Sequence, residues 1–415
     1  MIRGLTIAVS LGVGLGGCAR EDTPPTDTVS VAETTTAAPR SLEPAADPTR
    51  ISQGRALLER YECNRCHRID GVAPVALELD CAGCHAQIME GRFEAPPDQL
   101  AHWQEHVHAL LDVPTLSSTD RFARSWVAAF LQEAHTIRPN LGASMPRLDL
   151  SAEDAAAIAD FLVPSEEAGV PSFGDPDRGR TVLETKGCAA CHRFDGVPSL
   201  AAPPPPIELD AATFSRGARL APDLRHTRDR LRPAALVQWL RDPTSVKPDA
   251  AMPRIPLTEE EIADAAAYLL QAPLDLSPPA APPQRLPVLD RPVTHAEVDA
   301  EVFAKICRHC HASPDFIGGG GPGYAGGFGL PERKLDLSSY DGMLQGSVGD
   351  DGRRRSLFKP LEDGTPRLVA HLWARHAELA GAPIDGIRGM PLGLPPLSLE
   401  QIQLVETWIA QGRPR

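Results

Sequence analysis

The 415-residue sequence has no surplus of basic residues and few aromatic ones. It holds 41 lysines and arginines against 55 aspartates and glutamates, which gives a formal net charge of −14. Proteins that bind nucleic acid present a basic face, so this balance argues against a nucleic-acid partner. Aromatic residues make up only 5% of the chain. We therefore expect any small domain here to rely on something other than aromatic side chains to fill its core.

The sequence also lacks a long hydrophobic run. Its most apolar stretch, residues 5–15, follows a short charged start at Arg3 and falls short of the roughly 20 residues that span a bilayer. A start of this kind, with small residues before Cys18, is typical of a secretory signal. The segment Leu15-Gly16-Gly17-Cys18 resembles a bacterial lipobox, which implies a signal peptide at residues 1–17 and a lipid on Cys18. An ordinary signal peptide that happens to contain a cysteine is the alternative.

Length and proline placement divide the rest of the chain. A chain of 415 residues is too long for one ordinary core, and about three domains of roughly 100 residues are the default expectation. Residues 18–49 are rich in Thr, Pro, Ala and acidic residues, which predicts a disordered tether. Residues 274–294 are rich in proline and predict a stiffer linker. The folded parts are then an N-terminal region (50–165), a middle region (172–273) and a C-terminal region (295–415).

No cysteine is left over for a structural disulfide. One of the nine cysteines is Cys18, and the other eight form four Cys-x-x-Cys pairs, each followed at once by histidine. The motifs are Cys63, Cys66 and His67; Cys81, Cys84 and His85; Cys188, Cys191 and His192; and Cys307, Cys310 and His311. Two thiols at this spacing can each bond one vinyl group of a haem, with the histidine beneath the iron, so the motif is typical of covalent haem c attachment. A redox dithiol or a zinc site would not explain the histidine after every pair.

One pattern occurs three times: a short helix, a Cys-x-x-Cys-His motif, a variable middle, a Met-Pro pair and a capped helix. The Met-Pro methionines are Met145, Met252 and Met390, and each precedes a sequence that resembles a capping box. The pattern resembles class I cytochrome c domains, in which the last helix packs across the first. This resemblance implies a mostly α fold of three tandem cytochrome c-like helical domains. The C-terminal region departs most from the family pattern.

The resemblance also implies a sixth iron ligand in each repeat. The chain has only six methionines, and three of them are the Met-Pro methionines. A buried methionine is often only core filler, but the same placement in all three repeats favours ligation, which would raise the reduction potential. In the atypical C-terminal region His371 and His376 compete with Met390, whereas Met343 is interpreted as ordinary packing.

The N-terminal region holds two haem motifs because it contains an insertion. Alignment of Pro114 with Pro222, and of Phe130 with Trp239, places the extra residues between about 78 and 112. The second Cys-x-x-Cys-His motif lies inside this insertion. The inserted segment is therefore expected to bring a haem of its own, together with that haem's sixth ligand.

Three histidines in the insertion are candidates for that ligand. His102, His106 and His108 fall on a helix predicted over residues 98–111, and His106 lies nearest the edge of the helix's apolar stripe. We therefore predict ligation by His106, with Met89 a weaker candidate and solvated surface histidines the alternative interpretation. A haem with two histidine ligands would have a lower potential than the methionine-ligated ones.

These features predict a tetrahaem c-type cytochrome, with four covalent haems c, that transfers electrons in the bacterial cell envelope. We expect it to be periplasmic, to be held to a membrane through the lipid on Cys18, and to meet redox proteins of the envelope. No catalytic residue outside the haem sites is predicted. Two alternatives stay open: a peroxidase-like haem enzyme with one open-coordination haem, and a cytochrome subunit of a membrane quinol-oxidising or dehydrogenase complex.

Overall fold

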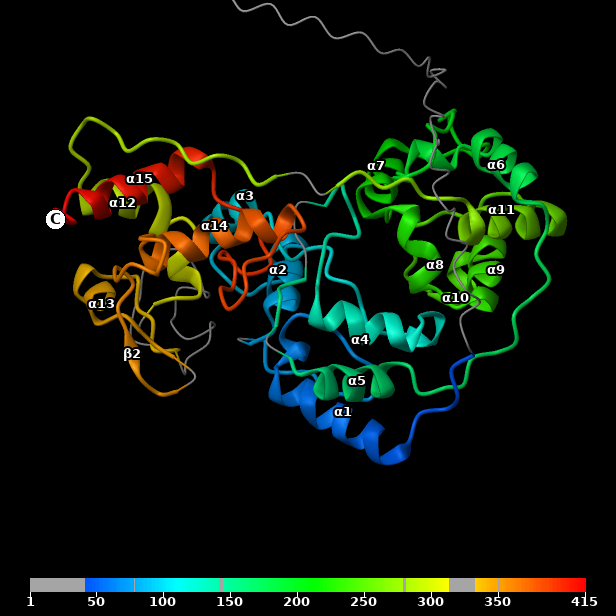
Figure 1. Ribbon diagram of the computed structural model, residues 1–415, viewed down its shortest axis with the longest axis horizontal. Coiled ribbons are helices and arrows are strands. Elements are labelled where there is room, and N and C mark those ends of the chain that lie inside the picture. The colour runs from blue at the N-terminus through cyan, green and yellow to red at the C-terminus, as the bar shows by residue number, and fades with distance from the viewer. Residues whose placement is uncertain are drawn as a thin grey trace, which may run out of the picture. The chain divides into compact units, whose positions relative to one another are not determined.

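A computed structural model describes residues 42–77, 79–141, 145–148, 150–278, 281–312, 333–349 and 351–415. The predicted signal peptide, Cys18 and most of the predicted tether lie outside these residues. The described part of the chain is mostly helical, which confirms the predicted mostly α class (Figure 1). No helix in these ranges is both long and apolar enough to cross a bilayer.

The N-terminal region is built around a first and a last helix that pack against each other. Its helices are α1 (Pro48–Arg60), η1 (Cys63–Arg65), α2 (Cys81–Met89), α3 (Pro97–His106), η2 (Thr119–Arg121), α4 (Arg124–Gln132) and α5 (Ala152–Leu162). Helix α1 begins where the Asp47 carboxylate accepts the backbone N–H of Thr49 at 2.8 Å, with Pro48 at the first helical position. Leu58 and Ile158 are fully buried between α1 and α5.

The middle region repeats this plan. Its helices are α6 (Pro176–Thr185), η3 (Cys188–Ala190), α7 (Ala211–Leu220), η4 (Leu224–His226), α8 (Thr227–Arg230), α9 (Pro233–Arg241), α10 (Pro243–Val246) and α11 (Glu259–Gln271). Thr258 and Glu261 form a complete capping box at the start of α11, as the sequence predicted. Helix α11 packs against α6, as α5 packs against α1.

The C-terminal region adds elements that the other two lack. Its elements are α12 (His295–Val298), η5 (Asp299–Phe303), η6 (Cys307–His309), α13 (Tyr340–Gln345), β1 (Ser347–Val348), β2 (Arg354–Arg355), α14 (Arg367–Leu379) and α15 (Leu399–Ala410). Strands β1 and β2 pair antiparallel, with Ser347 opposite Arg355. Helix α15 packs against α12 and η5, which together take the place of a first helix.

Buried hydrophobic side chains in the described residues form three clusters, one within each region. Phe122 contacts both the N-terminal and the middle cluster. The C-terminal cluster includes Phe303, Trp408 and Val293, all of which are fully buried. Val293 falls within the predicted linker at residues 274–294, so the end of that segment belongs to the C-terminal core.

A glycine marks the contact between first and last helix in two regions. A Cβ added to Gly54 of α1 would meet the carbonyl oxygen of Ala157 at 2.0 Å, and one added to Gly179 of α6 would meet that of Asp264 at 2.0 Å. Both distances are far below van der Waals contact, and both obstacles are backbone. The helices therefore approach closely because these positions carry no side chain.

Gly179→Ala is expected to lower the free energy of unfolding of the middle region by about 1–3 kcal/mol, because backbone must move to admit the new methyl group. Thermal unfolding followed by circular dichroism measures the change. Gly169→Ala is the matched control, since nothing lies within 4 Å of a Cβ there, and its effect should stay within about 0.5 kcal/mol. Equal stability of the two variants would contradict the close helix contact.

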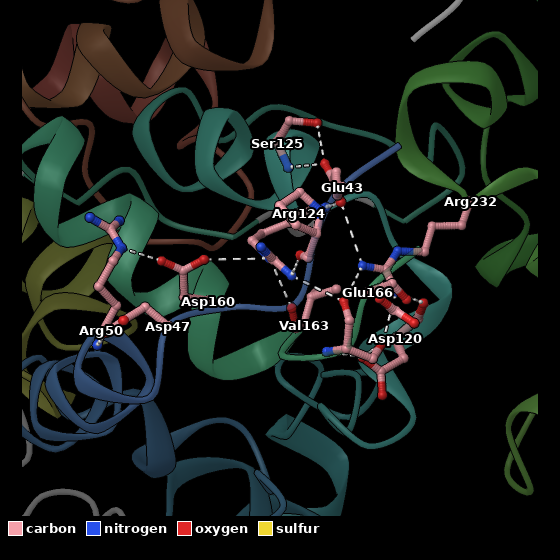
Figure 2. Close-up of polar contacts among 12 residues, drawn as sticks. Glu43, Asp47, Arg50, Asp120, Arg124, Ser125, Asp160, Val163, Glu166 and Arg232 are labelled. Atoms are coloured by element: carbon pink, nitrogen blue, oxygen red, sulfur yellow. Dashed lines mark hydrogen bonds and ion pairs between the residues drawn. The ribbon is translucent and has the colours of Figure 1, made fainter. Parts of the chain in front are cut away.

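Polar contacts join the N-terminal and middle regions. Arg232, which precedes α9, donates from Nη2 to the carbonyl oxygen of Ser165 at 2.9 Å and forms an ion pair of 3.5 Å with Glu43. Glu43 also accepts the backbone N–H groups of Arg124 at 2.8 Å and Ser125 at 2.9 Å (Figure 2). The end of the predicted tether, residues 42–49, is therefore part of the folded structure.

Equivalent segments of these two regions pair with each other. Phe122 and Leu231 form an antiparallel bridge. Two backbone hydrogen bonds of 2.9 Å flank it, from Ala123 N–H to Arg230 and from Arg232 N–H to Arg121. Arg121 and Arg230 occupy matching repeat positions, with the same sequence offset as Phe130 and Trp239. Each segment thus donates and accepts an equivalent backbone hydrogen bond, as in a two-fold symmetric interface.

Candidate functional site

All four histidines of the Cys-x-x-Cys-His motifs line one connected cavity in the described part of the protein. The cavity has a volume of about 1830 Å³, whereas a pocket for one small molecule usually measures about 300–1,000 Å³. The eight motif cysteines are all free thiols. The cavity therefore has room for more than one ligand, and thiols are available to bond it.

Three of the motifs share a local fold. In each, a short 3₁₀ helix begins at the first cysteine and the histidine N–H donates back to that cysteine's carbonyl oxygen: His67 to Cys63 at 2.9 Å, His192 to Cys188 at 3.0 Å and His311 to Cys307 at 2.8 Å. This tight turn brings both thiols and the imidazole close together. The inserted motif instead opens helix α2, where Asp80 caps the helix by accepting the N–H of Gly83 at 2.7 Å.

Three of the four motif histidines are held by a backbone carbonyl. Nδ1 of His67 lies 2.8 Å from the carbonyl oxygen of Pro114, Nδ1 of His192 lies 2.8 Å from that of Pro222, and Nδ1 of His85 lies 2.8 Å from that of Ala109. A carbonyl only accepts, so Nδ1 carries the proton and the Nε2 lone pair is free to bind a metal.

Burial keeps these imidazoles in the ligand form. It lowers the pKa of His67 and of His192, and the hydrogen bonds to Pro114 and Pro222 offset this only in part. Burial also lowers the pKa of His311 to about 4. A neutral imidazole is the form that coordinates iron, so these three sites present a competent nitrogen ligand at neutral pH.

The predicted helix over residues 98–111 is shorter in the structure, since α3 ends at His106. Leu110 takes the left-handed conformation, with φ of 62°. The chain has already left the helix at this point, and the carbonyl oxygen of the neighbouring Ala109 accepts the Nδ1–H of His85. A tertiary hydrogen bond to the second motif thus accompanies the early end of the helix.

The shorter helix changes which histidine meets the cavity. His106 is exposed, its Nδ1 lies 2.7 Å from the carbonyl oxygen of His102, and its ring faces the ring of His102 with centroids 4.4 Å apart. It groups with His102 and Glu105 on the outer face of α3, where their ligand atoms lie within 4.8 Å of one another. His108, which follows the helix, lines the cavity together with His85.

The three Met-Pro methionines all line the cavity. The Trp239 indole N–H donates to the sulfur of Met252 at 3.0 Å, which fixes that thioether beside the cavity. Met145 is partly buried against the N-terminal cluster and Met390 against the C-terminal cluster. Met343 differs, because it is 1% exposed within the C-terminal core, in agreement with its interpretation as packing.

The C-terminal region brings a second candidate ligand to the cavity. His371 of α14 lines the cavity, and its Nδ1 lies 2.7 Å from the carbonyl oxygen of Arg388. Its Nε2 is therefore free, as in the three anchored motif histidines. His376 differs, because its Nε2 lies 2.9 Å from the carbonyl oxygen of Leu397.

A buried ion pair holds the segment that carries Met390. Arg375 and Glu378 of α14 lie 3.1 Å apart and are 2% and 9% exposed. Glu378 accepts the N–H of Gly389 at 2.7 Å, and Arg375 donates from Nε to the carbonyl oxygen of Leu394 at 2.7 Å. The methionine is thus positioned by contacts on both sides of it.

Glu378→Ala is expected to destabilise the C-terminal region by about 3–5 kcal/mol, because it leaves the Arg375 guanidinium buried without its carboxylate. Chemical denaturation followed by tryptophan fluorescence measures the loss. Glu362→Ala, at an exposed position, is the control and should change stability by less than about 0.5 kcal/mol. A loss no larger than that of the control would contradict this role of the ion pair.

Thiols of the first two motifs touch. The Cys66 thiol and the Cys81 thiol share a hydrogen bond, which raises the pKa of Cys66 and lowers that of Cys81 to about 7. The ring of His85 lies 6.0 Å from that of His309, the residue before Cys310. The inserted motif therefore lies next to both the first and the fourth motif.

Residues 176–273 match the family model described as cytochrome c. No curated protein and no solved structure matches the chain. The matched segment holds Cys188, Cys191, His192 and Met252, and its thiol, imidazole and thioether groups fit a covalently bound haem c. The match covers less than half of the chain and supports a c-type cytochrome with a haem-based role in electron transfer.

Proposed function

We propose that the protein is a tetrahaem c-type cytochrome that transfers electrons in the bacterial cell envelope, with one haem on each Cys-x-x-Cys-His motif. The observation that carries the proposal is that all four motif histidines line one cavity, three of them with Nδ1 tied to a carbonyl. Each bound haem supplies a one-electron couple at its iron. The chain bonds the ring through two thiols, fixes the imidazole and sets the polarity around it.

The close approach of motifs supports a relay. Because each haem is bonded at its cysteines, the contact between Cys66 and Cys81 implies that the edges of the first two haems meet. The neighbouring rings of His85 and His309 extend the series toward the fourth motif. The inserted haem thus links the N-terminal and C-terminal sites, while the third motif joins through the paired segments around Phe122.

The sixth ligands are proposed from the same positions. Met145 and Met252 complete the first and third sites. At the second site the position of His108 on the cavity wall supports His108 in place of His106, whose side chain lies on the outer face of α3. At the fourth site Met390 is the proposed ligand, with His371 as its competitor.

The fourth site can be resolved by two substitutions in the holoprotein. If Met390 binds the iron, Met390→Ala opens one position that takes up CO in the reduced state, while His371→Ala leaves the spectrum low-spin. The reverse result, with CO uptake only in His371→Ala, would identify His371 as the sixth iron ligand at the fourth site. Optical spectra with and without CO measure both.

The location is proposed from the N-terminal sequence. The segment Leu15-Gly16-Gly17-Cys18 supports export and a lipid on Cys18, and the proline-rich residues after it support a tether to the folded part. The net charge of −14 supports docking to a basic patch on redox partner proteins of the envelope.

An electron carrier and a haem enzyme differ in whether one of the haem irons has an open coordination position. The proposal expects four low-spin haems that are reduced reversibly and bind little CO or cyanide. A peroxidase-like enzyme would show a high-spin fraction that binds these ligands readily. Spectra of the purified holoprotein with each ligand therefore test the carrier function directly.

A further inference from the structure

Three arginines gather where the N-terminal and middle regions meet. Arg121 and Arg230 both face the ring of Phe122, with guanidinium carbons 4.1 and 6.0 Å from its centroid. Arg121 is 8% exposed, and it donates from Nη1 to the carbonyl oxygen of Ser117 at 2.9 Å. Arg121, Arg138 and Arg230, which we call the arginine cluster, all line the cavity shared by the haem motifs.

The arginine cluster has no carboxylate of its own. None of its members forms an ion pair within the described ranges of the chain, and Nε of Arg230 is buried without a hydrogen-bond partner there. The nearby acids are engaged elsewhere: Asp112 pairs with Arg219 at 2.9 Å, and Asp249 pairs with Lys247. Arg121 is buried, and Arg138 and Arg230 are half-buried. Cations removed from water without a counterion are costly, so the cluster favours an anion inside the cavity.

The mutual repulsion of the three guanidinium groups also favours an anion beside the arginine cluster. Burial, together with the neighbouring positive charges of Arg138 and Arg121, lowers the pKa of Arg230 to about 9. Burial outweighs the opposing effect of Asp249 and lowers the pKa of Arg121 to about 10. The protein groups present thus leave these guanidinium ions short of negative charge.

We infer that the arginine cluster is a shared carboxylate site, which binds the propionates of the two haems held by His67 and His192. This inference rests on the proposed function. Each haem carries two propionate carboxylates, and arginine binds carboxylates in a bidentate geometry. His67, His192 and the cluster line the same cavity, so anionic groups of both haems have access to it.

The pairing of the two regions explains why one cluster can serve two haems. Arg121 and Arg230 hold equivalent positions on either side of the Phe122–Leu231 bridge. Because the segments around Arg121 and Arg230 are related by an approximate two-fold axis, equivalent faces of the N-terminal and middle regions meet there. The cluster therefore links the charge state of one haem to that of the other, and it makes the junction of the two regions part of the redox site.

The test is a redox titration of the holoprotein carrying Arg230→Met. A guanidinium ion favours the reduced iron, which is the less positive state, so its loss should lower the reduction equilibrium constant of both haems. For a charge about 10 Å from iron, at an effective dielectric constant of about 20, the decrease is about tenfold. Each haem is assigned with variants in which both cysteines of one motif are replaced by serine.

Two further variants separate charge from structure. Arg230→Lys keeps the positive charge and should leave the reduction equilibrium constants of both haems near the wild-type values. Arg254→Met removes one exposed arginine of the same region and should change neither by more than about twofold, because the charge is screened by water. If Arg230→Met does not fold, Arg138→Met is the substitute, with the same expected pair of shifts.

The shared site would be overturned if Arg230→Met changed the reduction equilibrium constant of only one haem, or changed it no more than Arg254→Met does. A wild-type protein without haem would instead overturn the proposed function, so the two failures are distinguishable. Simultaneous shifts of both haems, restored by Arg230→Lys, would support the inference.

Discussion

Met252→Ala is expected to convert the haem of the middle region from a six-coordinate to an open site. The reduced variant should bind CO at one iron, and the midpoint potential of that haem should fall by on the order of 0.1 V, because the methionine sulfur stabilises the ferrous state. Met252 lines the cavity with His192, and the Trp239 indole N–H holds its sulfur at 3.0 Å. Absorption spectra with CO and a redox titration measure both effects.

A buried methionine outside the cavity provides the control. Met343→Ala should destabilise the C-terminal region by about 2–5 kcal/mol through loss of core packing, with no new CO binding. Met252→His should keep the iron low-spin at a lower potential, since imidazole replaces the thioether. If Met252→Ala remained low-spin and took up no CO, ligation by Met252 would be wrong.

Replacement of both Cys81 and Cys84 by serine is expected to remove one haem and to interrupt the relay. The mass should fall by one haem, and the Soret absorbance should fall by about a quarter if each motif holds one haem. Electron equilibration between the N-terminal and C-terminal haems should slow, because the inserted motif contacts both Cys66 and the neighbourhood of His309. Flash photoreduction followed at the haem bands measures the rate.

The corresponding change in the middle region is the matched control. Cys188→Ser with Cys191→Ser also removes one haem, but it should leave equilibration among the other three unchanged. Equal slowing in both double variants would contradict a relay that runs through the insertion. An unchanged mass after the Cys81 and Cys84 substitutions would show that no haem is bonded there.

The local features of the fold could be predicted from sequence because they depend on nearby residues. Thr258 and Glu261 form the expected capping box, and Ser398 with Gln401 forms another. Gly54 and Gly179 lie in the first helix of the N-terminal and middle regions, and each precedes the first cysteine of a motif by nine positions. Such signals arise within a few residues of chain, where spacing alone determines the geometry.

Tertiary hydrogen bonds could not be predicted from the sequence, because their partners are distant along the chain. The apolar stripe of residues 98–111 gave no sign that the carbonyl oxygen of Ala109 would accept a hydrogen bond from His85 and that the helix would end at His106. The alignment of Pro114 with Pro222 found the right positions but not their role as acceptors for the motif histidines. A repeat pattern locates equivalent residues, but their partners come from the folded structure.

Contacts between the N-terminal and middle regions could not be predicted from the sequence either. Arg121 and Arg230 each look like ordinary surface arginines in their own repeat. Only the bridge between Phe122 and Leu231 brings them together at one cavity. Glu43, which the composition placed in a disordered tether, is held by Arg232 and by the start of α4, because its partners are far away in the sequence.

The most direct test of the account is the mass of the full protein, purified under denaturing conditions from a bacterial host that attaches haem c. Covalent attachment at the four motifs predicts a mass above that of the processed polypeptide by four haems, together with Soret absorbance that stays with the denatured chain. A mass equal to that of the polypeptide alone, with or without a lipid on Cys18, and the absence of a Soret band would contradict it.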